Sequence, residues 1–571
     1  MRSKRSRSVG LPAHMDKSRR EFLQYSGAVV GASILASSWP HRAAAQSATF
    51  DYYISPTGSD SNPGTLAAPW AITSLSNVAA NSNNVGNWNN IAGKRIGLLP
   101  GIYGVYSLWN NGTSSWNVPA LNIPGGTAAA PTYIGSCNAS GNYSPRTVQI
   151  TASPSGTPGG GLPGTSASSI AILGQAYNIG KGYVTLDGLI VSDSNGYGIH
   201  LDGGNNAPTP GATSGAGFTV QNCEVYNIGG STGNNPIGLL ITDAVGAHVN
   251  NCLVHDVTGA MQNFGGIEGW RCIGNLYEYN TVYNCPEGLY DKSTFGLPGP
   301  SANGTYRYNY IEVAGAYQRA PVNGSGGGPC LNLGYTLHVY NNIFVVAAGT
   351  ANNCVFLGVS DYEGHGWVSE ESLLFYNNTI YVVGGVNGSI QQGLVWQADG
   401  NADSPPATVT HYNNVYVMGP PSYRAVGFGS AAGAVTLSDY NLLTCGASSL
   451  CFTLGTNEVS GTNQYTLAQW QTLGWDAHSI MTAPTFLNQG QLMTSGASST
   501  TATAGYQLAS GSAGVGAGRI GGVSTGAAVD MGAWGGTDVN TGLAIAQIGV
   551  NLGATTTAPT PVPMAPVLSV S

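Results

Sequence analysis

Charged residues are scarce in this chain: Asp, Glu, Lys and Arg together make up 8% of its 571 residues, and the formal net charge is −8. If residues 1–45 are a removable leader, as argued below, 10 of the 18 Lys and Arg residues remain, against 24 of the 26 Asp and Glu residues. The mature chain would then carry a net charge of −14. So acidic a chain is not expected to bind nucleic acid or an anionic membrane surface.

Several motifs are also missing. After the leader, no apolar run approaches the roughly 18 residues that a membrane span requires. The nine cysteines contain no CxxC pair and the histidines form no HxH or HExxH pattern, which argues against the usual zinc sites. Glycine clusters such as GGTAAAPTYIG lack the Gly-Lys-Ser/Thr ending of a phosphate-binding loop, so nucleotide binding is not expected.

The first 45 residues carry the three parts of a bacterial export signal. SRREFLQ (Ser18–Gln24) is a twin-arginine motif, GAVVGASILASS (Gly27–Ser38) is an apolar run, and residues 43–45 are three alanines that suit cleavage. A twin-arginine signal directs the export of a protein that has already folded. We therefore expect the mature protein to be periplasmic or secreted, without a lipid anchor because no cysteine follows the apolar run.

In an exported protein the cysteines can form disulfides. Cys445 and Cys451 are the best local pair. Cys223 and Cys252 occupy equivalent places in the repeat described next, which fits either stacked packing or a disulfide.

The strongest fold signal is an internal repeat. With 84 Gly, 30 Pro and 42% hydrophobic residues, the composition favours turn-rich β structure. Short β-prone runs such as FTVQNCEVY and LFYNNTIYV are each broken by Asn or Asp, at markers 28 to 37 residues apart. The markers are Asp187, Asn222, Asn251, Asn280, Asn309, Asn341, Asn378, Asn413 and Asn441.

Three short strands per period, with Asn at one tight corner, describe one coil of a right-handed parallel β-helix. Asn tolerates the left-handed backbone of such a corner, and its amide can bond the coils on either side. One coil cannot bury its inner face alone, so many coils must stack and the ends must be capped. The sequence predicts an all-β, single-stranded right-handed parallel β-helix with N- and C-terminal caps over residues 46–540. A Pro/Thr/Ala-rich, partly disordered tail is expected over residues 541–571.

Both ends of this region resemble a known superfamily. YYISPTGSDSNPGTLAAPW (Tyr52–Trp70) and IGLLPGIYG (Ile96–Gly104) resemble the N-terminal entry of the pectate-lyase-like β-helix superfamily. LAQWQTLGWDAHSIMTAPTF (Leu467–Phe486), with GAWGG from Gly532, resembles its C-terminal end. The resemblance implies the fold over roughly residues 50–540. It implies no single activity, because lyases, hydrolases, epimerases and binding proteins share the scaffold.

Each coil is expected to contain a third short strand, along which side chains point alternately inward and outward. The outward side chains of successive coils predict a groove. The residues expected to point inward are Ile199, Leu239, Ile267, Leu289 and Leu331. The residues expected to face solvent form two rows, one of His200, Leu240, Glu268, Tyr290 and Asn332, the other of Asp202, Thr242, Trp270, Lys292 and Gly334. The predicted substrate-binding residues are His200, Asp202, Trp270, Tyr290 and Arg307.

The residue types in this groove suit β-elimination of a uronate-containing polysaccharide. The reaction needs a base that removes the proton α to the carboxylate, and positive charge that stabilises the developing enolate. Lys292 is the candidate base, because Arg271 and Arg319 nearby would lower its pKa. Calcium would supply the counter-charge, and its candidate ligands are Glu287, Glu268, Asp243 and Asp256.

A narrower resemblance favours the same chemistry. Glu287, Lys292 and Ser293, followed by RYNYI from Arg307 and then by Arg319, resemble the chondroitinase B and alginate lyase family. That resemblance implies a calcium-ligating Glu287, a basic Lys292 and an Arg319 that assists as acid. The match departs from the family pattern in two ways: Cys285 occupies the place of a second Glu, and the spacing to Arg319 is only approximate.

Three functions stay open at this stage. The first is a lyase or a mechanistically related epimerase. The second is a glycoside hydrolase that uses two of the carboxylates Asp202, Asp243, Glu268 and Asp291. The third is a non-catalytic glycan-binding protein, in which Trp270 and Tyr290 matter and Lys292 is an ordinary surface lysine. In each case we expect a polysaccharide partner and a monomeric protein.

Overall fold

The computed structural model divides the chain into residues 1–48 and 49–571, and everything below concerns the second part. It describes residues 49–551, apart from some gaps of a few residues and the segments 76–86, 152–165, 174–181, 204–214, 230–235, 259–264, 293–302, 314–329, 347–353, 361–371, 383–390, 399–407, 429–434 and 455–462.

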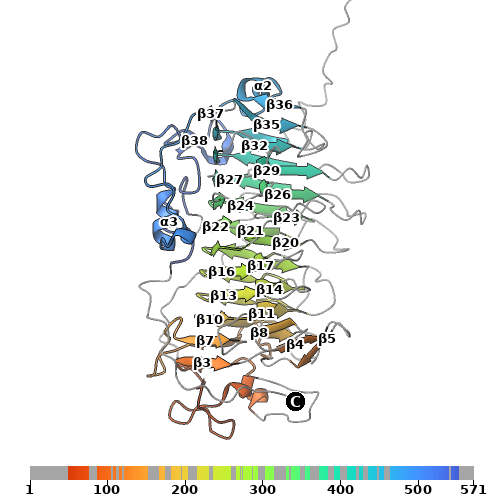
Figure 1. The fold of residues 1–571 in the computed structure, drawn as a ribbon, viewed down its shortest axis with the longest axis vertical. Coiled ribbons are helices and arrows are strands. Elements are labelled where there is room, and N and C mark those ends of the chain that lie inside the picture. Colours follow the sequence, from red (N-terminus) through yellow and green to blue (C-terminus); the bar gives the residue numbers. More distant parts are fainter. Residues whose placement is uncertain are drawn as a thin grey trace, which may run out of the picture. The chain divides into compact units, whose positions relative to one another are not determined.

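Each coil contributes one strand to each of three long parallel sheets, stacked along one axis (Figure 1). The first sheet consists of β1 (Tyr52–Ile54), β2 (Arg95–Leu98), β6 (Thr132–Ser136), β9 (Val184–Asp187), β12 (Thr219–Gln221), β15 (His248–Asn250), β18 (Leu276–Glu278), β21 (Asn303–Arg307), β24 (Thr336–Tyr340), β27 (Ser372–Tyr376), β30 (Thr408–Tyr412) and β33 (Val435–Asp439). The second sheet consists of β3 (Gly101–Gly104), β7 (Val148–Thr151), β10 (Leu189–Ser192), β13 (Glu224–Gly229), β16 (Leu253–Thr258), β19 (Thr281–Tyr283), β22 (Tyr310–Val313), β25 (Ile343–Val346), β28 (Thr379–Val382), β31 (Val415–Met418), β34 (Leu442–Cys445) and β37 (Ile480–Met481).

The third sheet consists of β5 (Ser115–Val118), β4 (Ser107–Asn110), β8 (Ser166–Leu173), β11 (Tyr197–Asp202), β14 (Ile237–Thr242), β17 (Gly265–Trp270), β20 (Leu289–Lys292), β23 (Cys330–Leu333), β26 (Cys354–Ser360), β29 (Gln391–Ala398), β32 (Tyr423–Phe428), β35 (Leu450–Leu454) and β36 (Gln464–Thr466). Only its ends are antiparallel, where β4 pairs with β5 and β8, and β35 pairs with β36. This stack of parallel sheets confirms the predicted β-helix.

The interior is filled by side chains that stack in register from coil to coil. In the first sheet, one inward column consists of Leu186, Val220, Val249, Tyr277, Tyr306, Val339 and Phe375. In the second sheet, the matching column consists of Val191, Val225, Val254, Val282, Ile311, Phe344 and Ile380. All of these side chains are buried. Each buried aliphatic side chain stabilises the fold by about 1.5–3 kcal/mol.

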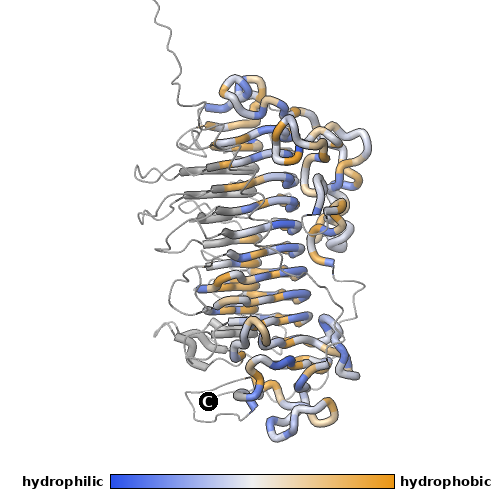
Figure 2. Tube along the Cα trace, turned by 180° about the vertical axis from the view of Figure 1, so that it is seen from behind, coloured by the Kyte–Doolittle hydropathy of each residue, from blue (hydrophilic) through white to orange (hydrophobic). Residues whose placement is uncertain are grey.

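The corner between the first and second sheets corrects the predicted asparagine row. Two successive positions are involved, and eight of the predicted markers are divided between them. The ninth, Asp187, is the last residue of β9 and precedes both positions. The first position has left-handed backbone and points outward, as at Asn341 (φ 55°) and Asn413 (φ 57°). The second position points inward and forms the hydrogen-bonded ladder, which runs through Asn280, Asn309, Asn342, Asn378, Asn414 and Asn441. Seen from behind, hydrophilic residues recur at one corner of successive coils (Figure 2).

The C-terminal end of the stack is capped as its sequence suggests. Helix α2 (Leu467–Thr472) begins with a capping box at Thr466 and buries Trp470 completely. The ring of Trp470 stacks on Phe452 with 4.7 Å between ring centroids. Close by, a disulfide joins Cys445 to Cys451, which confirms the predicted pair. Cys223 and Cys252 instead pack as buried thiols, so the packing alternative holds for them.

Beyond β37 the chain turns back along the outside of the coils. We call residues 482–551 the C-terminal strap; of these, 539–541 lie outside the described residues. It contains η5 (Met493–Ser495), α3 (Ser499–Gly505), β38 (Gly518–Arg519), η6 (Ile520–Gly522) and β39 (Ala528–Val529). Asn551 still bonds to Asn251, so the strap passes the predicted domain boundary at residue 540.

Elsewhere in the described chain, the remaining helices are η1 (Ile72–Leu75) and η3 (Trp88–Asn90). Within the described residues, no helix is both long and apolar enough to cross a membrane.

Candidate functional site

The outer face of the third sheet carries the predicted groove, and the strand register there agrees with the prediction over four coils. His200 pairs with Leu240, and Asp202 with Thr242. One coil further, Leu240 pairs with Glu268 and Thr242 with Trp270. Glu268 then pairs with Tyr290, and Trp270 with Lys292. Paired strands lie about 4.8 Å apart, so the two predicted rows are continuous from β11 to β20.

The inward row is confirmed over the same coils, and the register predicted for it shifts at the next one. Ile199, Leu239, Ile267 and Leu289 are all buried in the core. Leu331 was expected to follow Leu289, but it pairs with Asp291 instead. The register therefore shifts by two residues between β20 and β23. Alternation alone could not reveal this shift, because a displacement of two residues keeps every side chain on its own face.

Of the described outward residues, only Asp202 is partly exposed, and the burial of the others corrects a second expectation. His200 is 6% exposed and Glu268 is 4% exposed. His200 Nε2 lies 3.2 Å from Thr242 Oγ1, and its ring centroid lies 5.1 Å from that of Tyr197. Thr242 belongs to the predicted second outward row, whereas Tyr197 was not predicted to be part of the groove. Strict alternation from the inward Leu201 would place Tyr197 on the inner face, so the pattern gave no reason to single it out.

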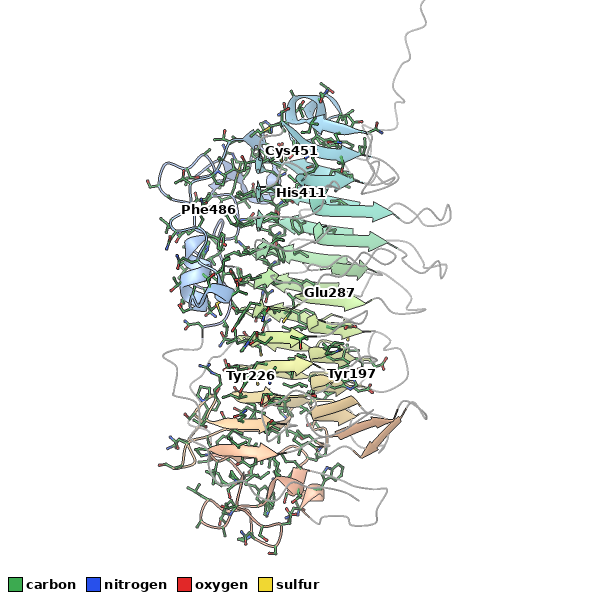
Figure 3. The ribbon with its side chains drawn as sticks, in the orientation of Figure 1. Tyr197, Tyr226, Glu287, His411, Cys451 and Phe486 are labelled. Carbon is green, nitrogen blue, oxygen red and sulfur yellow. A yellow bond between two sulfur atoms is a disulfide. The ribbon has the colours of Figure 1, made fainter. Side chains whose placement is uncertain are left out.

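Burial sets the ionisation of this cluster. Burial lowers the pKa of His200, although the carboxylate of Asp202 opposes that effect, so the imidazole is neutral near pH 7. Burial, together with the charge of Glu268, raises the pKa of Tyr197 to about 12. The cluster therefore offers a neutral imidazole and two hydroxyl groups beside a carboxylate. Figure 3 places Tyr197 and Glu287 on the side of the third sheet.

The four predicted calcium ligands do not meet in one place. Glu268 lies on β17, and the fully buried Glu287 precedes β20. Asp243 directly follows β14 and is 1% exposed. Asp256 lies on β16 in the second sheet. Across the residues described by the structure, no three His, Cys, Asp or Glu side chains lie close enough together to hold a metal ion.

Asp256 belongs instead to a stacked array on the second sheet. It bonds His255 Nδ1 at 2.8 Å, while Glu224 lies 3.4 Å from His255 Nε2. The His255 ring is sandwiched between Tyr226 and Tyr283, with interplanar angles of 7° on both sides. Burial lowers the pKa of His255, but its bonds to Asp256 and Glu224 outweigh burial and raise it above the usual value. These groups satisfy one another, as expected of a structural array.

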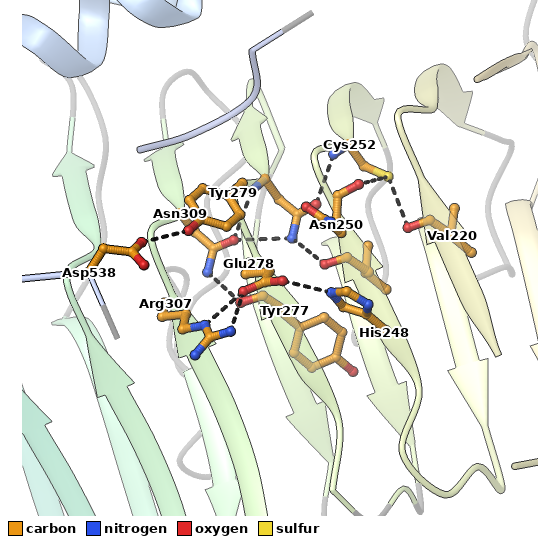
Figure 4. Close-up of polar contacts among 12 residues, drawn as sticks. Val220, His248, Asn250, Cys252, Tyr277, Glu278, Tyr279, Arg307, Asn309 and Asp538 are labelled. Atoms are coloured by element: carbon orange, nitrogen blue, oxygen red, sulfur yellow. Dashed lines mark hydrogen bonds and ion pairs between the residues drawn. The ribbon is translucent and has the colours of Figure 1, made fainter. Parts of the chain in front are cut away.

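Arg307 also lies away from the groove, which corrects its predicted place. It is on β21 in the first sheet and is 6% exposed. Its guanidinium bonds Glu278 at 2.6 and 2.7 Å (Figure 4). It also donates to the Tyr340 hydroxyl at 3.1 Å. Glu278 in turn lies 2.9 Å from His248 Nε2. Arg307 thus belongs to a buried ion-pair network. The RYNYI segment spans the end of β21 in the first sheet and the start of β22 in the second, so it does not reach the third sheet.

The remaining predicted residues fall outside what the structure describes. Arg271 and Arg319 lie outside the described residues. Trp270, Tyr290 and Lys292 are placed by the backbone register alone, and nothing is concluded about their side chains.

The stacked coils define the protein as a right-handed parallel β-helix. Residues 171–391 match the family described as a right handed beta helix region. No curated protein matches the chain.

Solved structures with which the chain aligns include three carbohydrate-active proteins. Pectate lyase Pel9A is 15% identical, with a TM-score of 0.46, over 84% of this chain and 95% of that one. The GH136 lacto-N-biosidase from Eubacterium ramulus is 16% identical, with a TM-score of 0.31, over 71% of this chain and 67% of that one. A rhamnogalacturonan lyase is 15% identical, with a TM-score of 0.31, over 64% of this chain and 87% of that one. None of these likenesses assigns an activity to the chain.

Proposed function

We propose that the protein is an exported enzyme that cleaves a uronate-containing polysaccharide by β-elimination on the outer face of the third sheet. The observation that carries this proposal is the pairing of β17 with β20, which sets Glu268 beside Tyr290 and Trp270 beside Lys292. An acid, two aromatic residues and one of the chain's few lysines thus occupy adjoining positions of two paired strands. Aromatic rings and charged groups on one face suit a charged sugar chain.

The proposed reaction assigns proton transfer to Lys292. In its neutral form Lys292 takes the proton from C5 of the uronate, next to the carboxylate. The electron pair left on C5 forms the new C4–C5 double bond as the bond between C4 and the glycosidic oxygen breaks. The leaving oxygen then gains a proton, for which the family resemblance suggests Arg319. Positive charge near the uronate carboxylate stabilises the intermediate enolate.

The cluster around His200 would bind the sugar units next to the cleaved bond. Half-buried Tyr197 can hydrogen-bond to a sugar hydroxyl group, and buried His200, itself within hydrogen-bond distance of Thr242, packs against its ring. Calcium remains part of the proposal as the counter-charge to the uronate. Because the described acids do not gather, calcium ligation would rest on Glu268 or Glu287 together with groups outside the described residues.

The first prediction concerns the product of this reaction. We expect the mature protein to generate ultraviolet absorbance from an unsaturated uronate when incubated with alginate, polygalacturonate or chondroitin and dermatan chains. Lys292→Ala should lower the rate by about 100-fold to 10,000-fold, which is the usual contribution of a general base. A calcium requirement would appear as loss of absorbance with chelator and its return with added calcium.

The matched control is Lys94→Ala, which removes an exposed lysine that precedes β2. It should leave the rate unchanged. Reducing ends released from neutral glycans without new absorbance would instead indicate a hydrolase. Binding without cleavage in either assay would refute an enzymatic role.

A further inference from the structure

The C-terminal strap runs along the coils in the direction opposite to their order in the sequence. In Figure 1 it is the blue segment with α3 that lies beside the stack. Arg519 contacts Asn413, Ala533 contacts Asn341, and the segment ends with Asn551 against Asn251. Residues 519–551 therefore pass six successive corners between the first and second sheets.

The outward asparagines of these corners bind the main chain of the strap. Asn413 bonds both main-chain groups of Arg519, accepting from its N–H at 3.0 Å and donating to its carbonyl at 2.8 Å. Asn251 makes the same double contact with Asn551, at 2.8 and 3.3 Å. Asn341 donates to the carbonyls of Ala533 and Gly535, at 2.8 and 2.9 Å. These contacts are all made to main-chain groups, so they do not depend on the side chains that the strap carries.

Apolar side chains and one buried carboxylate also hold the strap. Tyr506 and Ile545 pack with Tyr310 and Ile343 of the second sheet. Phe486 and Met531 pack in the same way with Val415 and Leu442.

The carboxylate is that of Glu312, which is fully buried. It accepts hydrogen bonds from the main-chain N–H groups of Met493, at 2.7 Å, and Thr494, at 3.1 Å. It thereby binds the start of η5. The strap covers the outer face of the second sheet from β19 towards the C-terminal end.

The strap nevertheless contributes no strand to the three long sheets. Within its described residues, β38 and β39 pair only with each other. The coils pair with one another strand by strand, as β25 does with β28, and this pairing does not involve the strap. A few main-chain hydrogen bonds also join the strap to the corners, from Gly532 N–H to the Asn413 carbonyl and from Gly549 N–H to the Tyr308 carbonyl. A segment that lies outside intact strand pairing can open locally while that pairing persists. We propose that the strap is a separable clamp, which docks on completed coils and opens as a unit, and that the outward asparagines determine where it docks.

Hydrogen exchange of the full mature chain tests this proposal. In the wild type, amides of residues 519–551 should exchange faster than those of β24, β27 and β30. Asn341→Gly removes two hydrogen bonds to the strap, and glycine accepts the left-handed backbone at this position. We expect strap amides to exchange about ten-fold to a hundred-fold faster in this variant, with coil amides unchanged.

The neighbouring residue provides a matched control. Asn342 belongs to the inward ladder, so Asn342→Ala should accelerate exchange in the coils around β25. The proposal is overturned if strap and coil amides exchange together in the wild type, or if Asn341→Gly accelerates both to the same extent. Either result would make the strap an integral part of one cooperative unit.

Discussion

At the scale of single residues, His411 illustrates how this interior accommodates polar side chains. It occupies the inward column of the first sheet directly after Phe375. Its Nε2 lies 2.7 Å from the Tyr416 hydroxyl and its Nδ1 lies 3.0 Å from Ser438 Oγ. Ser438 in turn donates to the buried carboxylate of Asp476 at 2.6 Å. Burial lowers the pKa of His411 to about 4, although the charge of Asp476 opposes that effect.

This shift predicts a pH dependence of stability. The unfolded chain takes up the His411 proton near pH 6.5, whereas the folded protein takes it up only near pH 4. Between these values the unfolded state binds more protons, so the free energy of unfolding should fall as the pH is lowered. The slope is at most about 1.4 kcal/mol per pH unit. Chemical denaturation at several pH values between 7 and 4 would measure it.

The comparison with His411→Asn isolates the contribution of His411 from those of the carboxylates. In His411→Asn, the free energy of unfolding should fall less steeply as the pH is lowered. His478→Asn should keep the wild-type slope, because the His478 side chain is 55% exposed. Equal slopes in the wild type and in His411→Asn would contradict the prediction.

The sequence correctly predicted which way the side chains of the third sheet point, but not how exposed they are. Alternation placed His200 and Glu268 on the outer face of the third sheet, as found. It could not predict that both are buried, because burial depends on what lies over a face as well as on which way a side chain points. Arg307 was misplaced for a related reason: clustering of cations in the sequence does not say which sheet each one joins.

At the scale of elements, the inward asparagine ladder joins the coils. Asn309 donates through Nδ2 to the Tyr277 carbonyl at 2.9 Å and to Asn342 Oδ1 at 2.9 Å. Its own Oδ1 accepts from the main-chain N–H and the Nδ2 of Asn280. The repeat predicted this corner and its period. It did not separate the two adjacent positions, because either asparagine of the YNN triplets fits the spacing.

The ladder predicts a large effect for a small substitution. Asn309→Ala removes these four bonds and leaves buried donors of Asn280 without their acceptor. We expect the free energy of unfolding to fall by about 3 kcal/mol, from denaturant titration followed by circular dichroism. The exposed Asn90→Ala should change it by less than about 0.5 kcal/mol. A loss for Asn309→Ala as small as that of the control would show that the ladder adds little stability.

At the scale of the whole molecule, the sequence predicted the stack and its C-terminal cap but not the strap. The coils repeat, and the cap carries its own helix signal at Thr466. The strap has no period and little regular structure, and its partners lie in distant coils. Such contacts leave no local pattern in the sequence. The resemblance of GAWGG to a superfamily end marked one part of the strap without indicating where it lies.

The cap should protect one end of the stack. Trp470→Ala empties a fully buried site between Phe452 and Trp475, so we expect a local loss of about 3–5 kcal/mol. Limited proteolysis should then cleave first near β35 and β34, and the coils around β13 should stay intact. Leu473→Ala, at a side chain that is 44% exposed, serves as the control. Uniform cleavage along the chain would contradict fraying from this end.

The position of the strap at the end of the chain also determines when the coils can be covered during synthesis. Successive coils bond across 27 to 36 residues, as in the ladder from Asn280 to Asn441, so each can close soon after it is made. The contact between Asn251 and Asn551 spans 300 residues. Until the ribosome has added that last stretch, Tyr310, Ile343 and Val415 remain uncovered on coils that are otherwise finished. A nascent chain therefore exposes these apolar side chains from their synthesis until the C-terminal strap is made, which is when a chaperone would have most to shield.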